Sequence, residues 1–188
     1  MPIGHVSLPT TPSTYKPMRD FYLAALKPLG YTAYFEKEGV FLGLQRNRDP
    51  DFWLHGGSAG SNPSEGERKL EEMTLVDPKL TAEENRKRIG QGRTHVAFSV
   101  AGRGEVEGWY RAAVKAGGIP NGEPGERDYV KGYYAAFVLD PVGNNIEVVC
   151  FNPWWMKLLN AAPGVAIAVA GAVAGQVALG YAKGAGWI

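Results

Sequence analysis

The chain has 188 residues, enough for one domain with a substantial core or for two small halves that share one. Hydrophobic residues make up 45% of it and charged residues 21%, as in an ordinary globular protein. The net charge of +1 offers no basic field for nucleic acid and no strong attraction to anionic lipid, so we expect no nucleic-acid partner.

The first half of the chain predicts a strand, a helix and three more strands. Residues 3–8 are short and alternating, which is typical of a strand. Residues 15–29 carry apolar side chains at helical spacing, with Thr14 or Ser13 as the expected cap and Gly30 at the end. Three strands are then predicted at 31–36, 40–45 and 51–55, with turns at Gly39 and over residues 47–51.

The same order returns in the second half. Residues 94–100 predict a strand, 105–116 a helix, and 116–132 turns around a short irregular strand. Strands at 133–140 and 145–152 are joined by the turn "PVGN". His5 and His95 stand at the head of equivalent strands, 90 residues apart. This duplication predicts an α+β fold in which two tandem βαβββ modules form one cupped, mixed β-sheet barrel.

These patterns divide the chain into four segments. We expect a first module over residues 1–56, an insertion over 57–92, a second module over 93–153 and an apolar tail, predicted helical, over 154–188. Within the insertion, residues 81–89 predict a helix, with Thr81 and Glu84 as a capping box. The insertion is either a surface excursion without chemistry or a lid over a pocket.

Three stretches carry a family resemblance: "GHVSL" at 4–8, "THVAFSV" at 94–100 and "YYAAFVLDPVGNNIEVV" at 133–149. Together they resemble the vicinal-oxygen-chelate superfamily of glyoxalase I, type I extradiol dioxygenases, fosfomycin-resistance enzymes and bleomycin-binding proteins. The resemblance covers residues 3–152 apart from the insertion. It implies a curled sheet around a metal, with His5, His95 and Glu147 at the ligand positions.

The residues themselves are compatible with such a site. Alternation places His95, Ala97 and Ser99 on one face of their strand, and Asn145, Glu147 and Val149 on one face of theirs. A carboxylate in a core strand is costly to bury unless it is paired or coordinated. Two imidazoles and a carboxylate suit a divalent ion such as Fe, Zn, Ni or Mn. For any one of the three residues alone, a structural role is the simpler interpretation.

The sequence also departs from each known chemistry of the resembled superfamily. Glyoxalase I has a glutamate base on its fourth strand, where this chain has Trp53, with His55 one period further along. The dioxygenases use additional histidines, and only His55 is available for that role. The small polar and basic cluster of a phosphonate site is also missing. Lyase, isomerase and dioxygenase reactions therefore all stay open.

The resemblance predicts a metal-dependent enzyme acting on a small oxygenated substrate that chelates the metal. The alternative is a metal-free protein that sequesters a small ligand, as bleomycin-resistance proteins do. We expect Glu147 and Tyr133 to be catalytic. The expected substrate pocket contains Trp53, His55, Arg127, Tyr129 and Tyr134, because tyrosine hydroxyls and a cation near the last hairpin suit an oxygen-bearing molecule.

The remaining features concern where the protein is located and what its tail contacts. Cys150 is the single cysteine and lies in an apolar run, so we expect a buried structural thiol. The N-terminus shows no secretion signal, which predicts a cytoplasmic protein. Residues 161–181 are uncharged and rich in Ala, Val and Gly, so they either associate with an intracellular membrane or pack on the domain or on a second chain. Whether the modules pair within one chain or across a homodimer is also open.

Overall fold

A computed structural model describes residues 4–47, 49–56, 75–89 and 93–151. The first module contains β1 (Val6–Thr10), α1 (Pro12–Ala25), a short 3-10 helix η1 (Lys27–Leu29), β2 (Thr32–Lys37), β3 (Phe41–Gln45) and β4 (Phe52–Gly56). The insertion contributes α3 (Ala82–Ile89). The second module contains β5 (His95–Ser99), α4 (Arg103–Lys115), β6 (Ile119–Glu126), β7 (Tyr133–Leu139) and β8 (Asn145–Phe151).

Each module forms its own four-stranded mixed sheet, and the two sheets have the same topology. The strand order is β1-β4-β3-β2 in the first and β5-β8-β7-β6 in the second. The first strand of each module pairs with the last in parallel, and the other neighbours are antiparallel. The duplication and the α+β class are therefore confirmed, but the strands form two sheets rather than one continuous barrel.

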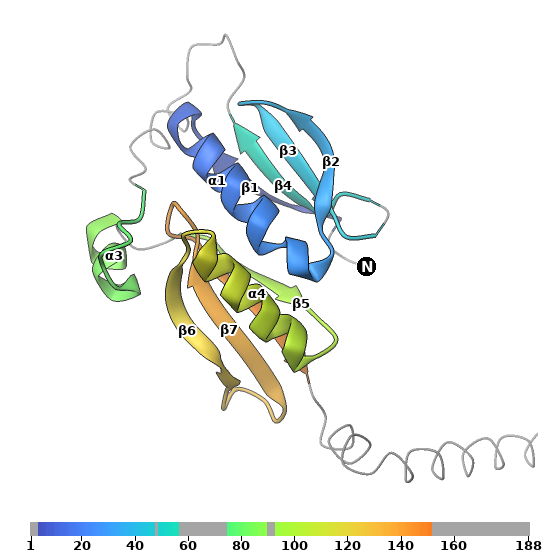
Figure 1. Ribbon diagram of the computed structural model, residues 1–188, viewed down its shortest axis with the longest axis vertical. Coiled ribbons are helices and arrows are strands. Elements are labelled where there is room, and N and C mark those ends of the chain that lie inside the picture. The colour runs from blue at the N-terminus through green and yellow to red at the C-terminus, as the bar shows by residue number, and fades with distance from the viewer. Residues whose placement is uncertain (1–3, 48, 57–74, 90–92, 152–188) are drawn as a thin grey trace, which may run out of the picture.

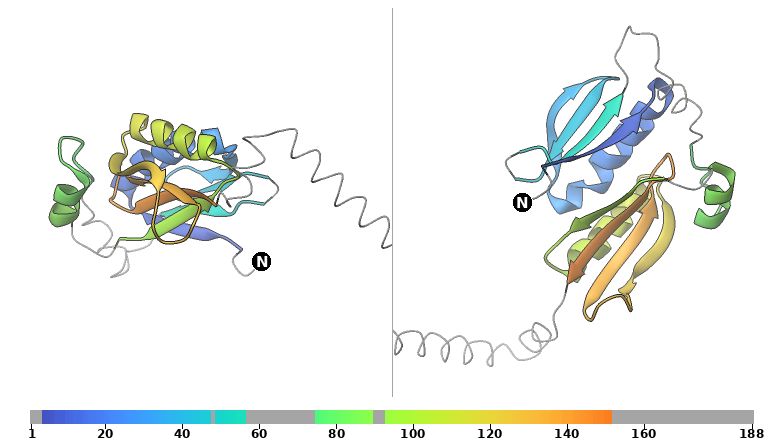
Figure 2. Two further views of the ribbon diagram at one scale, coloured as in Figure 1. Left: turned by 90° about the horizontal axis from the view of Figure 1, so that it is seen from below. Right: turned by 180° about the vertical axis from the view of Figure 1, so that it is seen from behind.

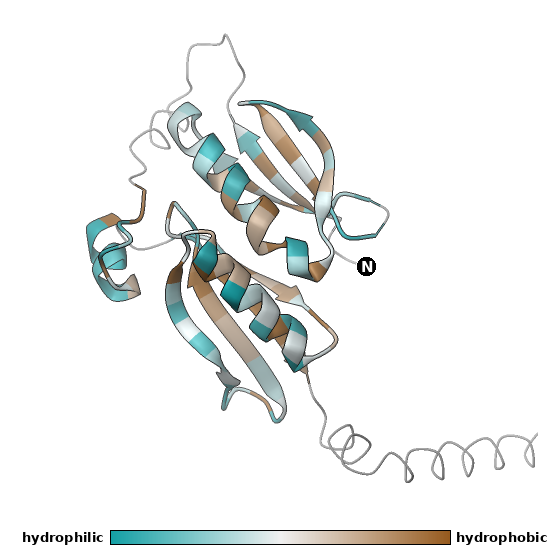
Figure 3. Ribbon diagram, in the orientation of Figure 1, coloured by the Kyte–Doolittle hydropathy of each residue, from teal (hydrophilic) through white to brown (hydrophobic). Residues whose placement is uncertain are grey.

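The two modules lie side by side, with α1 and α4 on the same side of both sheets (Figures 1 and 2). The inner faces of the helices and the sheets form a single core, to which both modules contribute. Its fully buried side chains include Phe21 and Tyr22 from α1, Trp109 from α4, Leu54 from β4 and Val138 from β7. The outer faces of both helices carry hydrophilic residues interspersed with weakly polar and apolar ones (Figure 3). The sheet face away from α1 and α4 is called the open face below.

A buried polar contact joins the modules inside this core. The Tyr22 hydroxyl of α1 donates to Oδ2 of Asp140, in the turn between β7 and β8, at 2.7 Å. The remaining partners of Asp140 are the backbone N–H of Val142 and both the backbone and side-chain N–H of Asn144, at 2.8 to 3.0 Å. Burial raises the pKa of Asp140, but these four donors satisfy both carboxylate oxygens.

Local capping explains where the helices begin. α1 starts earlier than the apolar spacing predicted, because Thr11 rather than Thr14 or Ser13 is its cap and Pro12 occupies the first turn. The Thr14 hydroxyl instead accepts a hydrogen bond from the backbone N–H of Thr11. Gly30, with φ of 81°, ends η1 as expected. In α3 the predicted capping box is present, since the Glu84 carboxylate accepts from the Thr81 backbone at 2.8 Å.

The helix α3 packs across one end of the second sheet. Its Ala82 and the preceding Val76 contact Ile119 of β6 and Leu139 of β7. Leu139 shares a register row with Asn145 and His95, so this contact lies on the open face. The insertion therefore covers part of that face, while residues 57–74 lie outside the described part of the chain.

Cys150 is buried, as expected. The predicted tail helix over 154–188, and with it residues 161–181, lies outside the described residues. Within the part of the chain that the structure describes, no helix has the length and apolar character needed to cross a bilayer.

Candidate functional site

The second sheet places His95, Asn145 and Glu147 together on its open face. His95 begins β5 and pairs in register with Asn145 of β8. Ala97, Glu147 and Phe137 form the next row across β5, β8 and β7. Because alternate residues of a strand share a face, and His95 pairs with Asn145, His95 and Glu147 lie on the same side of the sheet.

Glu147 is a buried carboxylate, 3% exposed, with two hydrogen-bond partners. Its Oε1 accepts from the Tyr133 hydroxyl at 2.5 Å, and its Oε2 lies 3.1 Å from Nε2 of His95. Burial and the bond to Glu147 raise the pKa of Tyr133 to about 12, so the phenol keeps its proton and donates it. The imidazole side chain is 49% exposed and connects the buried carboxylate with solvent.

Asn145 holds the other side of the His95 ring, and Asn121 in turn holds Asn145. The Nδ1 of His95 lies 3.0 Å from both the backbone oxygen and the side-chain nitrogen of Asn145. A protonated Nδ1 donates to the oxygen and an unprotonated one accepts from the amide, so the ring is held in either tautomer. Asn121 donates to Asn145 at 2.7 Å and accepts from Arg86 of α3 at 2.5 Å. The insertion thus reaches the histidine through a series of hydrogen bonds.

A cation lies across the same face. Arg127 stacks over the Phe137 ring at 5.3 Å, and its guanidinium donates to the backbone oxygens of Glu123 and Ala135. Phe137 in turn stacks near-parallel with His95, with ring centroids 6.4 Å apart. No carboxylate among the described residues forms an ion pair with Arg127. We call these residues the second-sheet cluster: Tyr133, Glu147, His95, Phe137 and Arg127. The cluster combines three hydrogen-bonded groups that can exchange protons with one positive charge.

Comparison with known proteins gives the family. The family model described as "Glyoxalase/Bleomycin resistance protein/Dioxygenase superfamily" matches residues 32–148. The chain belongs to this superfamily. Its members include many enzymes, among them glyoxalases and dioxygenases, and divalent metals are common among them. No curated protein matches the chain.

Solved structures of the superfamily share the fold. A putative glyoxalase from Bacillus halodurans matches with a TM-score of 0.52 and 18% identity, over 79% of this chain and 95% of that one. A glyoxalase/bleomycin resistance protein/dioxygenase family enzyme from Burkholderia phytofirmans PsJN matches with a TM-score of 0.50 and 16% identity, over 79% of this chain and 98% of that one. At these identities the likeness concerns the fold alone.

The structure does not assemble the three metal ligands that the resemblance to this superfamily implied. His95 and Glu147 are in contact, but His5 lies on the first module. It lines a cavity of about 420 Å³ between the modules, across which Ala97 and Ser99 of β5 stand. No group of three His, Cys, Asp or Glu side chains in the described ranges is close enough to hold one metal ion. The residues present, as placed within one chain, fit two ligands of a metal rather than three.

The other predicted pocket residues lie at three separate places. Tyr129 is 71% exposed and contacts Tyr133 edge to face, at the rim of the second-sheet cluster. Tyr134 points to the opposite face, where its hydroxyl donates to Glu107 of α4 and Arg103 covers its ring, so it does not line the cluster. Trp53 and His55 lie on the open face of the first sheet.

Three residues of this region were not predicted as functional. Asn145 pairs with His95 and Phe137 pairs with Glu147. Strand alternation therefore indicates that both lie on the open face, although no role was assigned to them. Asn121 has no such signal. It lies where the β6–β7 register shifts between Pro120 and Gly122, and such an irregularity turns a side chain to a new face.

Proposed function

We propose that this protein is an enzyme that binds a small oxygen-bearing molecule at the second-sheet cluster and moves a proton on it. The observation that carries the proposal is the series Tyr133–Glu147–His95, a buried carboxylate whose two partners are a phenol and an imidazole. A histidine held by a carboxylate is a common general acid or base, since its unperturbed pKa lies near neutral pH.

Each member of the cluster has a distinct role in this proposal. His95 is the exposed member and meets the ligand: its Nδ1 exchanges the contacts with Asn145 for one with the ligand, while Nε2 stays on Glu147. Glu147 orients the imidazole through its contact with Nε2, while the Tyr133 hydroxyl holds the carboxylate in place. Arg127 supplies positive charge for an oxygen that becomes negative during the reaction.

Proton exchange provides the test. Pyruvate and hydroxyacetone are incubated with the protein in deuterium oxide, and loss of their carbon-bound protons is followed by proton NMR. We expect exchange above the solvent rate, slowed about 100-fold or more in Glu147→Gln and in His95→Ala. Glu107→Gln is the matched control, because Glu107 also accepts from a tyrosine, Tyr134, but on the helix side.

Two outcomes would contradict the enzyme proposal. Exchange in the wild type no faster than in Glu147→Gln would remove the acid–base role. Saturable binding of either probe without any exchange would instead favour the alternative function, metal-free ligand binding.

A second candidate is a divalent-metal-dependent enzyme, which the contact between His95 and Glu147 favours. A bound Fe, Zn, Ni or Mn ion would act as a Lewis acid on the substrate oxygen. Metal content is measured by mass spectrometry on protein purified without chelators, before and after reconstitution. We expect about one ion per chain, lost in His95→Ala and in Glu147→Gln. His5→Ala shows whether His5 is a ligand too. Absence of bound metal after reconstitution would exclude this candidate.

A further inference from the structure

The open face of the first sheet carries an aromatic cavity that the acid–base chemistry does not use. Most of its lining residues belong to two register rows that point to this face. Ser7, Trp53, Gly43 and Phe35 form one row across β1, β4, β3 and β2, and Pro9, His55, Phe41 and Lys37 form the next. The cavity has a volume of about 370 Å³, within the range of small-molecule sites.

Three rings form the walls in a fixed arrangement. Phe35 and Phe41 stack, with centroids 5.5 Å apart and planes inclined by 15°. Phe41 meets Trp53 edge to face at 6.2 Å, and His5 also meets Trp53 edge to face, at 6.4 Å. Phe35 is 56% exposed, although it is a large apolar side chain. An exposed phenylalanine beside two other rings presents aromatic surface that a ligand would cover.

Glycine at position 43 makes room for the indole. A Cβ at Gly43 would lie 2.8 Å from two carbon atoms of the Trp53 ring, which is too close for any larger residue without movement. The indole N–H donates to the backbone oxygen of Pro50 at 3.2 Å. The ring is therefore positioned at both ends, and its polar edge is already occupied.

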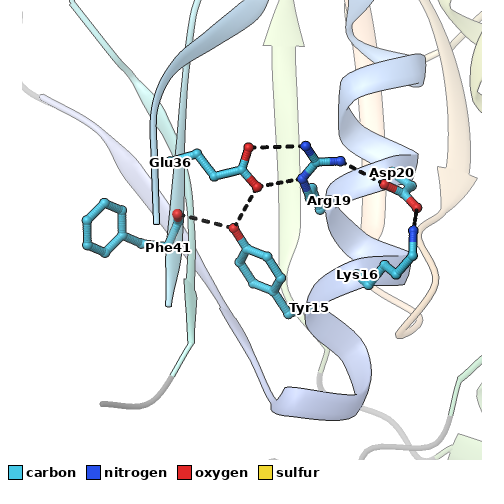
Figure 4. Close-up of polar contacts among 6 residues, drawn as sticks. All are labelled: Tyr15, Lys16, Arg19, Asp20, Glu36 and Phe41. Atoms are coloured by element: carbon cyan, nitrogen blue, oxygen red, sulfur yellow. Dashed lines mark hydrogen bonds and ion pairs between the residues drawn. The ribbon is translucent and has the colours of Figure 1, made fainter. Parts of the chain in front are cut away.

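The helix behind the sheet fixes the two phenylalanine walls. The Tyr15 hydroxyl of α1 donates to the backbone oxygen of Phe41 and to Glu36, both at 3.2 Å, and Arg19 pairs with Glu36 (Figure 4). Glu36 is the neighbour of Phe35 on β2. In the same view the Phe41 ring points away from α1, toward the open face. These contacts hold β2 and β3 at the spacing that stacks the two rings.

The lining of the cavity indicates the chemistry of its ligand. Among the described residues, no Asp, Glu, Lys or Arg side chain lines it, which suits a neutral molecule. His5, Ser7 and His55 form the polar part of the lining and can donate or accept hydrogen bonds. His5 also lines the cavity between the modules.

We propose that this aromatic cavity binds a planar, neutral aromatic molecule that carries a hydroxyl group. The ligand packs against the rings of Phe35, Phe41 and Trp53, by stacking on some of these rings and edge-to-face contact with the others, and the rim of His5, Ser7 and His55 bonds its hydroxyl. This goes beyond the proposed function, since none of the six residues belongs to the second-sheet cluster.

The test compares two probes with the same carbon skeleton. Binding of 2-naphthol and of the saturated decahydro-2-naphthol to the full chain is measured by equilibrium dialysis. We expect saturable binding of 2-naphthol, and at least tenfold weaker binding of the saturated probe, because only the planar ring can stack. Trp53→Leu should weaken 2-naphthol binding about tenfold. Tyr34→Leu is the matched control, since Tyr34 is exposed on β2 but does not line the cavity.

Further variants guard against misfolding and separate the proposals. Phe41→Leu repeats the test if Trp53→Leu does not fold. Three outcomes would each overturn the proposal. They are equal binding of both probes, displacement of 2-naphthol by the cation tetramethylammonium, and unchanged 2-naphthol binding in both Trp53→Leu and Phe41→Leu. Glu147→Gln should leave 2-naphthol binding unchanged, so failure of the acid–base proposal does not affect this result.

Discussion

At the scale of single residues, Glu36 shows how a surface charge contributes to stability. Its carboxylate accepts from Arg19 through both oxygens and from Tyr15, and these residues connect β2 with α1 (Figure 4). The hydrogen bonds from Arg19 are the main reason why the pKa of Glu36 lies below its ordinary value of 4.5. The ionised form is thus favoured in the folded state.

This lowered pKa predicts a pH-dependent effect of Glu36→Gln. The ionised carboxylate stabilises the fold above pH 4.5, and that contribution is lost as the pH falls through the folded-state pKa. The pair is partly exposed, so we expect Glu36→Gln to lower the free energy of unfolding by about 0.5–1 kcal/mol near neutral pH, and by less as acid protonates Glu36. Urea denaturation at several pH values measures the difference. Glu83→Gln, which removes an exposed pair with Lys87, is the control. A difference that stays constant with pH would contradict this explanation.

At the scale of elements, local signals predicted type and order well and boundaries less well. The apolar spacing of α1 was clear, but its start depends on the Thr11 cap and on Pro12, which lie before the first apolar position used. The capping box of α3 was predicted correctly because both of its members are local. The irregular β6 was the weakest prediction. Its two register shifts are set by pairing with β7, which is invisible in its own Gly- and Pro-containing sequence.

At the scale of the whole molecule, the shared core makes the two modules one folding unit. The Tyr22–Asp140 bond joins them within that core, between residues 118 positions apart. Tyr22→Phe removes the donor while keeping the ring, and it leaves one oxygen of a fully buried carboxylate with one partner fewer. We expect the free energy of unfolding to fall by about 1.5–3 kcal/mol.

Chemical denaturation measures this change, with Tyr110→Phe as the matched control. Tyr110 lies on α4, and its hydroxyl has no hydrogen-bond partner among the described residues. The control should change stability by less than about 0.5 kcal/mol. Equal effects of the two substitutions would show that the inter-module bond contributes nothing specific.

The sequence by itself determined the duplicated modules and the α+β class. Both depend on short-range alternation and spacing, which a strand or helix expresses wherever it packs. Only the tertiary structure decided that His5 lies apart from the second-sheet cluster, that Tyr134 faces α4 and that Asn121 reaches Asn145. The place of His5 depends on how the two sheets lie side by side. That of Tyr134 depends on which face of β7 is buried, and that of Asn121 on the register shift in β6. Such contacts join residues far apart in the chain, and no local pattern specifies them.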